Sequence, residues 1–144
     1  MTLHIRRSLA GLLAAAQSST FVIPFTTTVV NPCTAQTVTI GGSSTVTISE
    51  NVTGSGILNI DVGVVTKGIG IAVATKYTLS ESSQFSLKVN PNEEVQSDFT
   101  DKWMLKGAKS VDNWTHKIRL HITINALGEV TSLTQTDNGD VCNG

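Results

Sequence analysis

Charge and long apolar runs are both scarce in this sequence, and each scarcity excludes a class of protein. Only 15% of the 144 residues are charged, against roughly a quarter in an average soluble protein, and the formal net charge is −1. This composition excludes a nucleic-acid-binding protein that works through a broad basic surface. No apolar run approaches the ~20 residues that a helix needs to cross a bilayer, so we expect no membrane-spanning segment in the mature chain.

Cysteine is equally scarce. The two cysteines, Cys33 and Cys142, enclose nearly the whole domain. They lie far apart in the sequence, with no C-x-x-C or H-x-H nearby, and supply too few ligands for a metal site. In an oxidising compartment they would form a disulfide that ties the two ends of the domain together. Two unrelated free thiols are the alternative.

Familiar catalytic and cofactor motifs are missing as well. The sequence has no G-x-S-x-G elbow, no phosphate-binding loop, no H-E-x-x-H and no dinucleotide fingerprint. We therefore expect no cofactor, no bound metal and no catalytic residue, and we interpret the protein as a non-enzyme. Residues 137–140 include two aspartates but lack the glutamate that completes a calcium loop, so they predict a tight turn.

The sequence is rich in β-branched residues: 20 Thr, 15 Val and 11 Ile, together 46 of 144. Such side chains favour strands, and an apolar content of 40% is enough to build a core. Residues 17–144 divide into about nine to eleven short strands, with no amphipathic helix. The pattern predicts a single all-β domain, an antiparallel β-sandwich, with a β-barrel as the alternative.

The clearest predicted strand covers residues 115–125, where apolar and polar side chains alternate. One face of this strand is expected to lie in the core: Ile118, Leu120, Ile122 and Ile124. Residues 129–135 are expected to return beside it as a hairpin. Glycine- and serine-rich stretches at 41–44, 53–56 and 80–83 predict turns, and residues 95–101 predict a loop.

The first sixteen residues predict a secretory signal helix. A short basic start with Arg6 and Arg7 precedes an apolar run, which ends in the small-x-small pattern of Ala14 and Ala16. Cleavage would place the mature N-terminus at Gln17 and would leave 8 basic and 11 acidic residues. We therefore predict a secreted protein, either extracellular or periplasmic. A retained helix or membrane anchor is the alternative.

The segment 21–30 is apolar and threonine-rich, and it predicts an extended strand. Pro24 cannot donate a hydrogen bond to a ladder, so this strand should lie at a sheet edge or carry a bulge. An edge strand of this kind could add to the exposed edge of a neighbouring molecule. The segment is therefore the basis of an alternative function, as a structural subunit of an extracellular assembly.

Candidate contacts for a glycan or a partner come from aromatic and basic side chains. Trp103, Trp114 and Tyr77 could form a sugar-stacking platform, although filling the core is the simpler interpretation. Lys117, Arg119 and His121 are expected on the outer face of the strand at 115–125, where they are either solvated or bind an anionic partner. His116 lies five positions before His121, so the two rings should point to opposite faces.

Several short motifs give the chain a family resemblance over roughly residues 20–142. They are Asn31-Pro32-Cys33, the strand His121-Ile-Thr-Ile-Asn125-Ala-Leu-Gly128-Glu129-Val130-Thr131, and the near-terminal Cys142. In this pattern the chain resembles a group of small exported bacterial proteins of unknown function. The resemblance implies an exported β-sandwich with a disulfide between its ends, and it transfers no catalytic residue. The middle of the chain departs most from the family pattern, with Ala35-Gln36 where the family has Gly-Glu.

Taken together, these features predict a secreted binding or surface-interaction module without catalytic activity. The expected partner is a glycan, a cell surface, another protein or a second copy of the chain.

Overall fold

The computed structural model describes residues 2–3, 17–108, 112–127 and 129–143 as an all-β structure with no α-helix among them. The strands are β1 (Thr2–Leu3), β2 (Gln17–Val30), β3 (Thr37–Val52), β4 (Leu58–Ile71), β5 (Lys76–Val89), β6 (Val95–Lys106), β7 (Trp114–Ile124) and β8 (Val130–Cys142). Of the segment expected to form a signal helix, only Thr2 and Leu3 are described, and both are extended. The rest of that segment lies outside the described residues.

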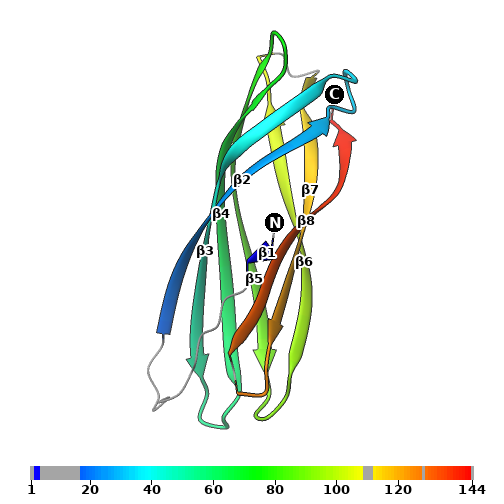
Figure 1. The fold of residues 1–144 in the computed structure, drawn as a ribbon. Helices are drawn as coiled ribbons and strands as arrows, with labels where there is room; N and C mark the ends of the chain where they lie inside the picture. Colours follow the sequence, from blue (N-terminus) through cyan, green and yellow to red (C-terminus); the bar gives the residue numbers. More distant parts are fainter. Residues whose placement is uncertain (1, 4–16, 109–111, 128, 144) are drawn as a thin grey trace.

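The seven long strands form one antiparallel sheet in the order of the chain. Each strand from β2 to β8 pairs with the next, and β1 adds to the far side of β8. The sheet is curled like half of a barrel, so that one face becomes the interior (Figure 1). The prediction of an all-β fold is confirmed, but the described residues form one sheet where a sandwich needs two. Each strand pairs with its neighbour in the chain through a short connection, so all the long strands stay in one sheet.

The strands are fewer and longer than the sequence predicts. The predicted turns at 41–44 and 80–83 lie inside β3 and β5, and the predicted loop at 95–101 lies inside β6. Gly42 shows the physical reason: it lies opposite Gly68 of β4, and a Cβ atom on Gly42 would be 2.1 Å from the Lys67 carbonyl oxygen. Glycine at this position permits a close approach of two backbones instead of a turn. The predicted turn at 53–56 is confirmed between β3 and β4.

The interior of the curled sheet holds two apolar clusters. The first cluster lies toward the β3–β4 and β7–β8 hairpins and combines side chains from β3, β4, β7 and β8, among them Val46, Ile60, Ile122 and Leu133. The second lies toward the opposite end and contains Tyr77, Trp103 and Trp114 with their aliphatic neighbours. Strands at the two ends of the sheet therefore pack against each other, and this packing maintains the curl.

The long β7 strand has the orientation that its alternation predicts. Ile118, Leu120, Ile122 and Ile124 are all at most 3% exposed, and β7 pairs antiparallel with β8 as the expected hairpin. The edge position that Pro24 predicts is also confirmed, because β2 is the last strand of the sheet.

The sheet is weakly joined between β5 and β6. These strands share only two residue pairs, Thr78 with Lys106 and Leu79 with Leu105. Beyond that point side chains bridge the strands: Phe85 and Phe99 have ring centroids 4.6 Å apart. The Ser83 hydroxyl also donates a hydrogen bond of 2.5 Å to the buried Asp101 carboxylate.

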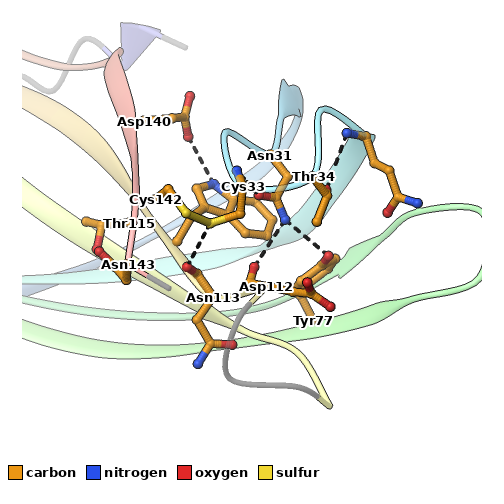
Figure 2. Close-up of a disulfide and its surroundings, with 12 residues drawn as sticks. Asn31, Cys33, Thr34, Tyr77, Asp112, Asn113, Thr115, Asp140, Cys142 and Asn143 are labelled. Atoms are coloured by element: carbon orange, nitrogen blue, oxygen red, sulfur yellow. Dashed lines mark hydrogen bonds between the residues drawn. A yellow bond between two sulfur atoms is a disulfide. The ribbon is translucent and has the colours of Figure 1, made fainter.

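The predicted disulfide between Cys33 and Cys142 is confirmed, with the two Cα atoms 5.0 Å apart. It joins the β2–β3 connection to the end of β8. Figure 2 shows the buried Asn31 side chain beside it, where the amide donates 3.1 Å hydrogen bonds to the Tyr77 hydroxyl and the Asp112 carbonyl oxygen. The Asn31 side-chain oxygen also accepts a hydrogen bond from the Cys33 backbone N–H. These bonds hold the Cys33 loop in place against the second cluster.

Candidate functional site

A β-bulge in β8 determines the local geometry of the candidate site. The register of β7 and β8 shifts between His116 and Ile118, because Asn138 and Gly139 together lie opposite one residue of β7. Gly139 has a φ of +97°, a conformation that glycine adopts without strain. The extra residue places Asp137 and Asp140 on the same face of β8, although a regular strand would separate them. The tight turn predicted at 137–140 is therefore wrong.

The two aspartates of the bulge hold the buried His116 side chain between them. Asp140 Oδ1 lies 2.8 Å from Nδ1 of the ring, and Asp137 Oδ1 lies 3.1 Å from Nε2. Asp140 Oδ1 also accepts a 3.0 Å hydrogen bond from the Trp114 indole N–H. A carboxylate oxygen can only accept, so each contact to the ring is a hydrogen bond when the ring nitrogen carries a proton. The His116 ring therefore lies in contact with both carboxylates of the bulge.

A cavity of about 290 Å³ opens between β2 and β8, next to this cluster, and we call it the seam cavity. Its lining comes from four strands: Phe25, Thr26, Thr27, Trp103, Ile118, Gln135, Thr136 and Asp137. Phe25 and Trp103 form its aromatic side, with ring centroids 4.5 Å apart. On the polar side, Asp137 is 57% exposed and accepts a 3.5 Å hydrogen bond from the Thr27 hydroxyl. The cavity therefore combines an aromatic wall with a positioned carboxylate.

The three aromatic residues proposed as a sugar-stacking platform are buried. Tyr77 and Trp114 are 0% exposed and Trp103 is 2% exposed, so they do not form an exposed row. The simpler interpretation, that they fill the core, agrees with their burial. Core packing takes precedence because the domain has few aromatic residues to fill the space inside the curled sheet. Of the three, Trp103 alone lines the seam cavity.

The proposed basic contacts Arg119 and His121 share a carboxylate on the outer face. Asp98 of β6 accepts hydrogen bonds of 3.1 and 2.8 Å from Arg119, and it lies 2.7 Å from Nδ1 of His121. Lys117 lies opposite Lys102 in the register. As expected, His116 and His121 point to opposite faces. The shared acid partly neutralises this face, which weakens its attraction for an anionic partner.

The Asp98 carboxyl should titrate far below the ordinary range. Hydrogen bonds from Arg119 and then from His121 lower the pKa of Asp98 from 3.8 to about 2. Because the folded state favours the ionised form, this contribution to stability is complete above pH 3.8 and disappears as the pH falls through about 2. A carbon-detected NMR titration of the side-chain carboxyls should give this midpoint. Arg119→Gln should return the pKa toward 3.8; an unchanged midpoint in that variant would contradict the assignment.

Sequence reasoning missed Phe25, Gln135 and the link between His116 and the two aspartates. The signal that could have indicated the link is the Asn138-Gly139 pair inside a segment that otherwise continues as a strand. Phe25 and Trp103 lie far apart in the chain, so no local sequence pattern indicates that their rings form the aromatic wall.

Among the described residues, no group of three or more His, Cys, Asp or Glu side chains could hold a metal ion. No helix in the same part of the chain is long and apolar enough to span a membrane.

Comparisons with protein-family models, with curated proteins and with solved structures return no match.

Proposed function

We propose that the protein is an exported, non-catalytic binding module that takes one sugar unit of a glycan in the seam cavity. The observation that carries this proposal is the pairing of the Phe25–Trp103 wall with the Asp137 carboxylate across one small opening. A sugar ring has an apolar C–H face, which packs on an aromatic ring. Its hydroxyl groups donate hydrogen bonds, and a carboxylate is a strong acceptor for them.

The size and polarity of the seam cavity support a small polar ligand. Its volume of about 290 Å³ lies just below the range of about 300–1,000 Å³ for sites of drug-sized ligands, which suits a single sugar unit. Thr26, Thr27 and Thr136 add hydroxyl groups at its rim. One carboxylate lines the cavity among the described residues, whereas sugar hydrolysis ordinarily needs two. This composition favours binding over cleavage.

Export is the second part of the proposal. The disulfide is typical of a protein from a non-reducing compartment. The signal-like residues 1–16 and the resemblance to small exported bacterial proteins point in the same direction. Protein recovered outside the cytoplasm should begin at Gln17, and cleavage there would remove β1 from the edge of β8. N-terminal sequencing tests this part, and an intact Met1 would contradict it.

The alternative role as a strand-adding assembly subunit has no specific support from the structure. β2 pairs with β3 along its whole length, from Gln17 opposite Glu50 to Val30 opposite Thr37. Residues 25–27 of β2 also line the seam cavity. One edge of the segment on which this alternative rested therefore already has a partner within its own chain.

A glycan array followed by calorimetry with the best-bound sugar tests the proposed site. Phe25→Leu removes the partly buried aromatic ring of the wall, and Asp137→Asn removes the negative charge of the acceptor. Each change should weaken binding about tenfold or more, as expected for the loss of a stacking surface or a charge-assisted hydrogen bond.

Matched controls separate the cavity from the rest of the surface. Phe85→Leu removes another partly buried phenylalanine, which stacks on Phe99. Asp61→Asn neutralises an exposed carboxylate that is hydrogen-bonded to Ser86. Both controls should bind the sugar like the unaltered protein. An array with no bound glycan, or equal losses in the controls and the cavity variants, would overturn the proposal.

A further inference from the structure

The β4–β5 hairpin reverses the chain with apolar residues. The Ala72 N–H donates a 2.9 Å hydrogen bond to the Thr75 carbonyl oxygen, and Val73 and Ala74 occupy the reversal. Val73 is 103% exposed and Ile71 is 61% exposed. We call Ile71, Val73 and Ala74 the apolar tip. Figure 1 shows this hairpin protruding at one end of the molecule.

Turn geometry does not explain the apolar tip. The described non-glycine residues with positive φ are Ala35 and Asn92, so Val73 and Ala74 have ordinary backbone conformations. A polar residue would suit the reversal equally well, and reversals favour Gly, Asn, Asp and Ser. Two connections at the opposite end of the sheet follow that preference, with the sequences Thr53-Gly54-Ser55-Gly56 and Asn90-Pro91-Asn92-Glu93-Glu94. The β7–β8 connection at that end also exposes a large apolar side chain, Leu127, but no lysine lies within this connection.

Lysines accompany the apolar tip on the outer face of the sheet. Lys76 lies directly opposite Ile71 in the register, so the two side chains share a face. Lys106 of β6 lies opposite Thr78, one row further from the tip on that face. Both lysines are exposed. The exposed acids Glu93 and Glu94 belong to the opposite end of the molecule.

We propose that the apolar tip docks the protein on an anionic lipid bilayer. Apolar side chains at a membrane surface enter the boundary between headgroups and acyl chains, while neighbouring lysines contact anionic headgroups. The tip provides Val73 and Ile71 for the first role and Lys76 and Lys106 for the second. The end that carries Glu93 and Glu94 points away from the bilayer. Charge complementarity thus favours a bilayer over a neutral protein pocket as the occupant. The attachment is peripheral and reversible because only a few side chains enter the lipid.

Co-sedimentation with vesicles tests the docking. The purified protein should bind vesicles of equimolar phosphatidylglycerol and phosphatidylcholine at least about tenfold more strongly than vesicles of phosphatidylcholine alone. Added salt should weaken this binding, because it screens the lysines. Val73→Asp should lower the partition onto the anionic vesicles about tenfold or more. The double variant Lys76→Gln/Lys106→Gln should lower it by a similar factor.

Two controls test whether the effect belongs to the tip. Leu127 is 76% exposed in the β7–β8 connection at the opposite end, so Leu127→Asp should bind the vesicles like the unaltered protein. Lys88→Gln/Lys102→Gln removes two exposed lysines elsewhere and should have a smaller effect than the pair at the tip. Equal binding by Val73→Asp and the unaltered protein, or no binding to anionic vesicles, would overturn the proposal. Sedimentation equilibrium tests whether a second copy of the chain covers the tip instead of a bilayer. A protein that does not bind vesicles, and that is a dimer which Val73→Asp converts to a monomer, would overturn the proposal in favour of that second copy.

Discussion

Ile122→Asp is expected to leave the protein unfolded at room temperature, whereas His121→Ala, one position earlier, should fold normally. Ile122 is 2% exposed in the first apolar cluster and lies opposite Leu133 of β8. Loss of a buried isoleucine side chain costs about 2–5 kcal/mol, and an unpaired buried charge costs several more. This sum is most of the roughly 5–15 kcal/mol by which an ordinary domain is stable. Circular dichroism and amide NMR spectra measure the outcome.

The neighbouring substitutions provide the controls for this prediction. The His121 side chain lies on the partly solvated outer face, where it contacts Asp98 and Thr123, so its removal should cost at most about 1 kcal/mol. Ile122→Val keeps an apolar side chain and should cost about 0.5–1.5 kcal/mol. A folded Ile122→Asp variant beside an unfolded His121→Ala variant would mean that the register of β7 is shifted by one residue.

Loss of the disulfide between Cys33 and Cys142 should lower the free energy of unfolding by about 4–5 kcal/mol. The bond closes a loop with a sequence separation of 109, and a loop of that size restricts the unfolded chain by about this amount in the chain-entropy description. For a domain of this length the melting temperature should fall by roughly 10–20 °C. Denaturant unfolding of Cys33→Ala, with and without a reducing agent, measures the effect.

Three comparisons make the disulfide prediction specific. Cys33→Ala, Cys142→Ala and the double variant should lose the same stability, because any one of them removes the single cross-link. The reduced unaltered protein should resemble them. The reducing agent should not affect the variants further, because the chain has no other cysteine. Equal unfolding midpoints for oxidised and reduced protein would contradict the entropic account.

Alternation and composition were sufficient to predict the local features of the fold. The residues of β7 that repeat with a period of two are buried, and the β7–β8 hairpin forms as expected. Pro24 marks an edge strand because it lacks the backbone N–H that a strand with neighbours on both sides would have to donate. The pairing of the two cysteines also agrees with the sequence interpretation, since a chain with two cysteines offers each of them one partner within the chain.

Strand length and sheet closure could not be predicted in this way. A glycine has the same local signature in a turn and in a strand where two backbones approach closely, and only the Gly42–Gly68 pairing distinguishes the two cases. The same ambiguity affects Gly139, whose positive φ makes a bulge within β8 instead of a turn between strands. Sequence patterns therefore predicted more strands and shorter ones.

The sequence by itself determined that the chain is all-β, which side chains of β7 enter the core and which cysteines pair. These features depend on side-chain alternation or on residue type, and both are local properties of the chain. The tertiary structure alone decided that one sheet curls on itself and brings Phe25, Trp103 and Asp137 to a common cavity. It also decided that one bulge places two aspartates on His116. These contacts join strands that are distant in the chain, and they depend on the accumulated register and curl of the sheet, which no short segment specifies.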